Sequence, residues 1–171
     1  MANVIKEQKL IDTQKRALLK YVFIGDGATA QSNTVLVDVS NLAYSLNANG
    51  QIMSSNTHPR SVYRTTIKRV FGQAKANGYV VLQWHGMNGL SNQEIVTISS
   101  GGFDYEFENL GGGAVMHNPN LSDSANTNGD ILISTVSPGV DDVFTIFIDL
   151  KKDNQDYDAG QTADPKAFNI V

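Results

Sequence analysis

Cysteine is absent from the chain, which excludes disulfide frameworks, cysteine-based zinc sites and thiol nucleophiles. Long apolar runs are also absent. The longest, residues 21–24 and 143–148, have the length of strands, whereas a membrane helix needs roughly 18 apolar residues. The first residues turn polar after Ile5 and offer no secretory signal peptide. We therefore expect a protein that is made in a cytoplasm and does not cross a membrane.

Charged residues are also scarce, at 18% of the 171 residues, while 41% are hydrophobic and 15 are glycine. This balance is too apolar for a disordered chain and is typical of a turn-rich β protein. The net charge of -4 disfavours general binding to nucleic acid or to an anionic membrane. The length predicts one domain, which we place at residues 1–152, followed by an acidic tail at residues 153–171.

The charges are divided unevenly along the chain. Residues 1–75 carry ten Lys and Arg against four Asp and Glu, a net charge of +6. Residues 76–171 carry three against thirteen, a net charge of -10. The two halves either neutralise one another inside one compact domain, or they form a basic and an acidic face that meet partners in a repeating assembly.

Apolar periodicity predicts strands along almost the whole chain. Residues 16–25 are mostly apolar on both faces, which indicates a strand buried on both sides. Residues 103–108 alternate strictly, so we expect their aromatic side chains to point inward and Asp104, Glu106 and Glu108 to point outward. The other expected strands are residues 34–39, 79–85, 93–99, 131–136 and 143–151.

Turn residues predict which strands are neighbours. The glycine-containing loop at residues 86–89 predicts a hairpin between residues 79–85 and 93–99. The Pro-Gly turn within residues 137–142 predicts that the strands at 131–136 and 143–151 form the last pair.

Residues 61–76 fit either a helix or a strand. Their many β-branched residues favour the strand, because such side chains lose rotamer freedom in a helix. A strand places Ile67 and Phe71 on one side, with Thr66 and Lys68 on the other. Asn77-Gly78 then predicts a tight turn into Tyr79.

Eight or nine strands with no clear helix predict an all-β fold. We expect an antiparallel two-sheet β-sandwich with long loops, of which the jelly roll is one form. Long polar connections occupy residues 40–60, 110–130 and 153–171. Loops of this length are uncommon in compact domains unless they bind something or become ordered on assembly, so we expect these three to form the functional surfaces.

No pattern of catalytic residues stands out. His58, His85 and His117 are far apart, and no closely spaced histidine pair supports a zinc site. The chain has no Gly-x-Ser-x-Gly elbow. Its glycine-rich segments at residues 25–30 and 111–113 lack the Lys-Ser/Thr of a phosphate-binding loop, so we interpret them as turns. We therefore expect no enzyme activity and no cofactor.

Acidic residues at 123–130 and 153–158 are of the kind that calcium takes as ligands. The first segment does not fit an EF-hand, because Thr135 falls where the bidentate carboxylate belongs. We interpret both segments as solvated loops without a metal, and Asp104, Glu106 and Glu108 as a solvated face rather than a glycosidase pair.

Trp84 alternates with Val80 and Leu82, which indicates a core position, with a sugar-binding platform as the alternative. Basic residues of the first half have no interleaved aromatic residues, so contact with acidic protein surfaces is favoured over nucleic acid. These residues are Lys9, Lys15, Arg16, Lys20, Arg60, Arg64, Lys68 and Arg69.

Six segments in a fixed order carry a resemblance to a known class of proteins. They are residues 9–20 (KLIDTQKRALLK), 33–40 (NTVLVDVS), 82–86 (LQWHG), 110–113 (LGGG), 128–135 (NGDILIST) and 144–152 (FTIFIDLKK). Together they span nearly the whole chain, and their order resembles that of small virion structural proteins of tailed bacteriophages.

The resemblance implies a small β-sandwich or jelly-roll subunit of a virion, with no catalytic residues. We therefore expect a capsid decoration or cement protein that binds and stabilises the outer capsid shell. Its implied partners are the major capsid protein or other virion proteins, with a homotrimer as one assembly, and its implied location is the virion.

Two alternatives stay open. The first is a neck, tail or fibre component of the virion. The second is a carbohydrate- or receptor-binding β-sandwich module, which would use Trp84 or Tyr157 together with calcium in the Asp-rich loops.

Overall fold

The computed structural model describes residues 3–13, 16–42, 65–86, 91–107 and 129–152. These residues contain a single-turn 3₁₀ helix, η1 (Val39–Asn41), and no α-helix. Their strands are β1 (Val4–Asp12), β2 (Arg16–Asp26), β3 (Thr34–Val37), β4 (Thr65–Lys75), β5 (Tyr79–Trp84), β6 (Gln93–Ile98), β7 (Gly101–Glu106), β8 (Ile131–Val136) and β9 (Val140–Lys152).

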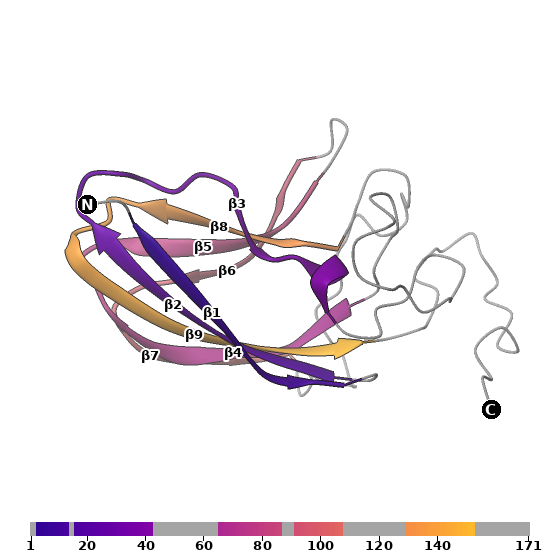
Figure 1. Ribbon diagram of the computed structural model, residues 1–171. Helices are drawn as coiled ribbons and strands as arrows, with labels where there is room; N and C mark the ends of the chain where they lie inside the picture. Colours follow the sequence, from indigo (N-terminus) through magenta and orange to yellow (C-terminus); the bar gives the residue numbers. More distant parts are fainter. Residues whose placement is uncertain (1–2, 14–15, 43–64, 87–90, 108–128, 153–171) are drawn as a thin grey trace, which may run out of the picture.

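The strands form two antiparallel sheets that face one another (Figure 1). The five-stranded sheet has the order β1-β2-β9-β4-β7, and the four-stranded sheet has the order β3-β8-β5-β6. The chain is therefore an all-β, two-sheet antiparallel sandwich, as the sequence predicts. The hairpin expected between residues 79–85 and 93–99 is confirmed as the β5–β6 pair.

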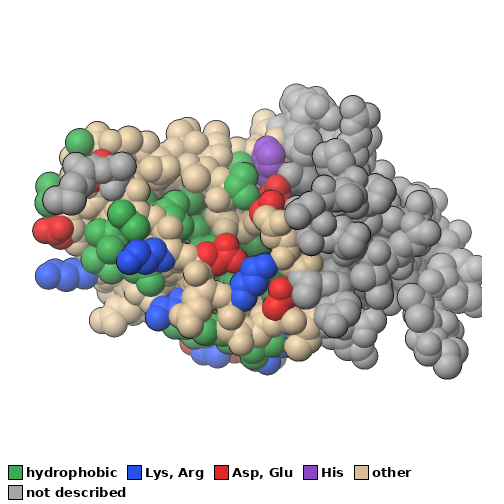
Figure 2. All heavy atoms as spheres, viewed as in Figure 1, with side chains coloured by type: hydrophobic (Ala, Val, Ile, Leu, Met, Phe, Trp, Pro, Cys, Tyr) green, Lys and Arg blue, Asp and Glu red, His purple; other side chains and the backbone are tan. Residues whose placement is uncertain are grey.

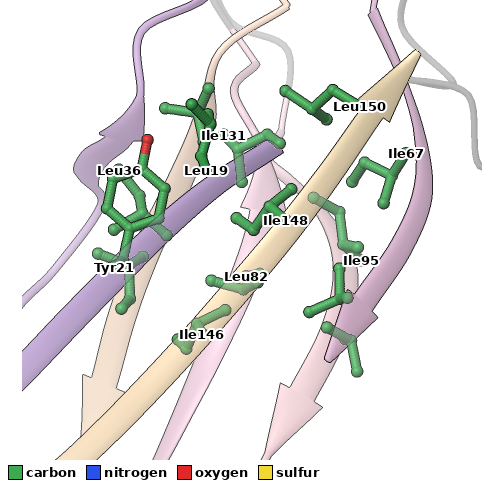
Figure 3. Close-up of a cluster of buried hydrophobic side chains, with 14 of the residues drawn as sticks. Leu19, Tyr21, Leu36, Ile67, Leu82, Ile95, Ile131, Ile146, Ile148 and Leu150 are labelled. Carbon is green, nitrogen blue, oxygen red and sulfur yellow. The ribbon is translucent and has the colours of Figure 1, made fainter. Parts of the chain in front are cut away.

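The core lies between the sheets, where alternate side chains of each strand meet (Figure 3). From the five-stranded sheet, β2 contributes Leu19 and Tyr21, and β9 contributes Ile146, Ile148 and Leu150. They face a second set of fully buried side chains from β5 and β8: Val80, Leu82, Trp84, Ile131 and Ile133. The alternation expected of half-buried strands therefore accounts for these side chains of the core.

The second face of β2 is a correction to the sequence prediction. Residues 16–25 were expected to be buried on both sides, but Leu18, Val22 and Ile24 are only half-buried. The reason is the number of layers. A sandwich of two sheets covers one face of each strand, and burial of both faces needs a third layer.

The expected pairing of the strands at 131–136 and 143–151 is wrong. β8 pairs with β3 and β5, whereas β9 pairs with β2 and β4 in the other sheet. The Pro-Gly turn therefore carries the chain from one sheet to the other. The link at Asn77 and Gly78 does the same, because β4 and β5 also belong to different sheets.

Asp142 holds these two crossing links together. Its buried carboxylate accepts hydrogen bonds from the backbone N–H groups of Asn77 (2.9 Å), Gly78 (3.1 Å) and Gly139 (2.7 Å). A single side chain thus satisfies three donors at the places where the chain leaves one sheet for the other. Buried donors left without an acceptor are costly, so Asp142 stabilises both crossings.

The ambiguous segment is a strand, as predicted, for its described residues 65–75. Its expected faces are partly wrong, because the pairing with β9 skips Lys68 between Ile67 and Arg69. This β-bulge reverses the alternation that follows it. Ile67 and Val70 are buried in the core, while Phe71 points to the outer face and is half-buried.

Two edge strands also differ from expectation. β1 was not predicted, since most of its residues are polar and exposed. In β7, the expected inward aromatic face holds only in part: Phe103 is half-buried and Tyr105 is exposed, although Phe107 just after the strand is buried. Edge strands overhang the facing sheet, which covers their side chains less completely.

Candidate interaction surface

The connections give the sandwich two different ends. At one end the chain passes between sheets through short links, residues 27–33, 76–78, 99–100 and 137–139. The opposite end, at the right of Figure 1, contains the last described residues before the segments 43–64, 87–90, 108–128 and 153–171. We name it the long-segment end. Thr65 pairs with Lys152 in the five-stranded sheet, and Trp84 pairs with Ile131 in the four-stranded sheet. In each sheet, residues next to two of these segments therefore lie side by side.

Asp130 organises the long-segment end within the four-stranded sheet. It is 8% exposed, and its Oδ1 accepts the N–H of Val39 at 3.0 Å. Its backbone carbonyl accepts the N–H of His85 at 2.9 Å, and the Nδ1 of His85 lies 4.0 Å from Asp130 Oδ2. Asp130 is the last residue of the Asp-rich segment 123–130, and these contacts give it a structural role.

Ion pairs join the strands of the five-stranded sheet at the same end. Arg16 donates two hydrogen bonds to the carboxylate of Asp149, at 2.8 and 2.7 Å. Lys152 contacts Asp12, and the Lys152 side chain is 5% exposed. Burial lowers the pKa of the Lys152 ammonium, although Asp12 acts in the opposite direction. β1, β2 and β9 are thus linked by charge as well as by backbone hydrogen bonds.

The outer face of the five-stranded sheet carries an aromatic pair. Phe71 of β4 and Phe147 of β9 stack with their ring centroids 4.9 Å apart and their planes at 7°. The Nζ of Lys20 lies 5.9 Å from the Phe147 centroid, and the guanidinium of Arg69 lies 4.7 Å from the Phe71 centroid. We name Phe71, Phe147, Lys20 and Arg69 the outer aromatic patch.

Charged and apolar groups surround this patch. Arg69 also binds Asp104 of β7 through two hydrogen bonds, and this contact lowers the pKa of the Asp104 carboxyl. Val22, Ile24 and Val143 are half-buried on the same face. Figure 2, which views the molecule from the same side as Figure 1, also shows acidic, basic and hydrophobic side chains beside one another on the surface. Aromatic residues and Arg are enriched in protein interfaces, which makes this outer face a candidate surface for contact with another protein.

The structure places some of the sequence-predicted residues. Trp84 is 1% exposed, which confirms its core position and removes it as a sugar platform. Residues 25–30 contain the expected turn, in which Asp26 accepts the N–H groups of Ala28 and Thr29 at 2.9 and 2.8 Å. These two hydrogen bonds lower the pKa of Asp26. Asp104 and Glu106 are exposed, as expected.

Other predicted residues lie outside the described part of the chain. They are His58, His117, Glu108, Tyr157, Lys15, Arg60, Arg64, residues 111–113, and the acidic residues at 123–128 and 153–158. Within the described ranges, no group of three His, Cys, Asp or Glu side chains could hold a metal ion. No helix in these ranges is long and apolar enough to span a membrane.

Sequence reasoning missed the outer aromatic patch. The predicted alternation put Phe71 on the same side as Ile67, and only the bulge at Lys68 brings Phe71 beside Phe147. The spacing of apolar residues in the sequence could have indicated the bulge. Ile67 and Val70 are both apolar but three residues apart, a spacing that a regular strand cannot place on one face.

Comparison with known proteins adds no relative: no family model, curated protein or solved structure matches the chain. The function must therefore be argued from the fold and the surface.

Proposed function

We propose that this chain is a structural protein of a virus particle, acting as a decoration or cement protein that binds and stabilises the outer capsid shell. The strand order carries the proposal. A jelly roll with β1 added at one edge would place β2-β9-β4-β7 in one sheet and β3-β8-β5-β6 in the other, so the observed strand order supports this form of the sandwich. Jelly rolls are the fold of many viral capsid subunits and of lectin domains.

The connections between the strands also support a jelly roll. Among the described strands, the consecutive pairs β1–β2 and β5–β6 each lie in one sheet, and every other consecutive pair is divided between the two sheets. Repeated crossing of this kind is expected of the two Greek keys in a jelly roll. It ties the sheets together at many points, and a rigid unit of this kind suits a particle that must keep its shape.

The two ends of the sandwich support a role in assembly. The described residues that flank the segments 43–64, 108–128 and 153–171 all lie at the long-segment end. Long connections that start and end at one side of a core give a subunit directional contacts with its neighbours. The outer aromatic patch offers a second surface, on the face of the five-stranded sheet.

The alternatives differ in how much support they have. A neck, tail or fibre component draws on the same fold and surfaces, and the position in the particle separates it from a decoration protein. A carbohydrate-binding module loses Trp84 as its platform, since that ring is buried. The described residues contain no other exposed aromatic group beside a cluster of calcium ligands.

Electron cryomicroscopy of the particle that encodes this chain tests the proposal. We expect density for the sandwich on the outer surface of the capsid, in contact with the major capsid protein. Density at the neck or tail would support the first alternative instead. Absence of the chain from purified particles would contradict a structural role altogether.

Rebinding to stripped capsids tests the electrostatic part of the proposal. Exposed charges are screened beyond about 8 Å at physiological ionic strength, so rising salt should slow association more than it speeds release. A variant carrying Arg64→Glu and Lys68→Glu should show a slower association rate already at low salt. Rates that ignore both the salt and the substitutions would remove the electrostatic contribution.

A further inference from the structure

One edge of β1 pairs with no other strand in the described part of the chain. Of the described strands, only β2 pairs with β1, and β1 ends the order of the five-stranded sheet. Residues 6–10 are all exposed, and Val4 and Leu10 are 40% and 42% exposed. A strand edge of this kind presents unpaired backbone N–H and C=O groups, which are a template for another strand.

We propose that two copies of this chain pair through β1. The two strands run antiparallel about a two-fold axis, with Gln8 opposite Gln8 of the second copy. The pairing joins the two five-stranded sheets edge to edge into one continuous sheet. The proposal goes beyond a role in the capsid and does not depend on it.

Strand geometry restricts the register. Alternate residues of β1 direct their backbone groups toward β2, and the residues between them direct theirs outward. In an antiparallel pair, two directly opposite residues either both direct their backbone groups toward the partner strand or both direct them away. Under two-fold symmetry this condition holds only when a residue lies opposite the same residue of the second copy, with the axis midway between them. Near the middle of β1, the axis can therefore pass through Glu7, Gln8 or Lys9.

The charges of β1 select one of these three registers. An axis at Glu7 places Glu7 opposite its own copy, and an axis at Lys9 places Lys9 opposite its own copy; both set like charges directly across the strands. An axis at Gln8 places Glu7 opposite Lys9 of the second copy, and the symmetry repeats that pair. Opposite charges across an antiparallel pair are stabilising and like charges are destabilising, so the Gln8 register is favoured.

The bulge of β1 sets the length of this pairing. The ladder with β2 shifts between Lys9 and Ile11, which leaves Leu10 as the extra residue. Regular pairing therefore covers residues 7–9 of each copy, and Lys6 lies opposite the bulged Leu10 at either end. In the single chain, the Nζ of Lys9 lies 3.9 Å from Asp12 Oδ2 and donates a hydrogen bond to the carbonyl of Asn41 at 2.5 Å. These contacts keep the Lys9 ammonium close to β1.

Disulfide trapping tests the register directly, because the chain has no cysteine of its own. In the proposed register, the Gln8→Cys variant sets its thiol opposite the same thiol of the second copy, at a spacing close to the roughly 4 Å that a disulfide needs. The matched control is Lys6→Cys, whose two thiols are offset by about 13 Å along the strands. We expect mild oxidation to give a covalent dimer of Gln8→Cys and to leave Lys6→Cys a monomer. Equal cross-linking of the two variants, or none of Gln8→Cys, would overturn the register.

Sedimentation of the full chain without cysteine tests the association itself. We expect a dimer that dissociates on dilution, and Glu7→Lys should raise its dissociation constant by about tenfold or more, since it sets like charges on both sides of the axis. The double variant Glu7→Lys, Lys9→Glu exchanges the charges and should restore the dimer. Far-ultraviolet spectra should match among all three proteins, because these side chains are exposed. A chain that is monomeric at every concentration, or a trimer, would refute pairing through β1.

Discussion

Asp142 gives the sharpest prediction about how this sandwich is held together. Replacing it with asparagine or alanine removes the carboxylate that accepts the N–H groups of Asn77, Gly78 and Gly139. Asp142 is 2% exposed, so water cannot easily take over these three hydrogen bonds. Because the bonded groups lie on both crossing links, the loss should destabilise the whole domain.

The magnitude follows from the number and kind of hydrogen bonds. A hydrogen bond to a charged group contributes about 1.5–3 kcal/mol, and such contributions are not additive at one site. Asp142→Ala leaves all three donors without an acceptor, so we expect a loss of about 3–4 kcal/mol. Asp142→Asn keeps one oxygen, which can still serve Gly78 and Gly139, but turns an NH₂ group toward the N–H of Asn77. We expect it to cost about 2 kcal/mol.

The loss should also depend on pH. Burial acts to raise the pKa of Asp142, but the three backbone hydrogen bonds outweigh it and lower the pKa in the folded state. A group with a lowered folded pKa stabilises the fold above its unfolded pKa of about 3.9 and loses that contribution as the pH falls through the folded pKa. The difference between wild type and Asp142→Asn should therefore be full near neutral pH and shrink on acidification below about pH 4.

Urea unfolding at a series of pH values measures both effects. The matched control is Asp141→Asn, which makes the same charge change at the neighbouring, exposed position. Asp141 has a φ of 60°, a conformation that asparagine also tolerates, so this variant should stay near wild type. A stability of Asp142→Asn within about 0.5 kcal/mol of wild type, or a loss that is the same at every pH, would contradict this role of the Asp142 carboxylate.

Three further predictions concern the core, a close backbone contact and metal binding. Trp84→Ala should cost about 3–5 kcal/mol in chemical unfolding, and Trp84→Phe clearly less, because the buried Nε1 has no hydrogen-bond partner among the described residues; equal losses would contradict this. Gly72→Ala should cost more than about 2 kcal/mol by the same assay, since its Cβ would lie 2.0 Å from the carbonyl oxygen of Thr145, and wild-type stability would refute the close approach of β4 to β9. Added chelator should leave the melting temperature unchanged; a fall of several degrees would instead assign calcium to the Asp-rich segments.

The existence of most strands could be predicted from the sequence, because one buried face leaves a period of two in the apolar residues. β2 and β5 follow this pattern throughout, and β9 follows it from Asp142 to Ile148. β1 does not, because it lies at an edge where neither face is fully covered, so no periodic signal distinguishes it from a polar terminus.

Partnership between strands could be predicted only where a hairpin forms. The loop at residues 86–89 joins true neighbours, whereas the Pro-Gly turn at Ser137–Gly139 joins strands of different sheets. Both segments contain glycine and both predict a turn, so the turn residues do not distinguish the two outcomes. The sheet to which the next strand returns depends on the packing of the whole sandwich, which no short segment encodes.

The outer aromatic patch shows the same limit on the scale of one residue. Phe71 and Phe147 are visible in the sequence as members of strands, but their contact depends on the single extra residue at Lys68. A one-residue shift moves every later side chain of a strand to the opposite face. Regular alternation therefore predicts the wrong face for Phe71 until the bulge is known.

The strand order explains how the uneven division of charge along the chain can stabilise the five-stranded sheet. Strands of the basic first half and the acidic second half interleave in the order β1-β2-β9-β4-β7. Arg16 of β2 therefore meets Asp149 of β9 across 133 residues, and Arg69 of β4 meets Asp104 of β7 across 35 residues. If both halves carried charges of the same sign, these side chains would repel one another where the strands meet, because like charges on neighbouring strands are destabilising. The segregation of charge along the chain thus favours pairing between strands of different halves, which is the pairing that a sheet of this order requires. Internal neutralisation therefore accounts for Arg16 and Arg69, and in the proposed function any salt-sensitive attachment to a partner would depend on the other basic residues of the first half.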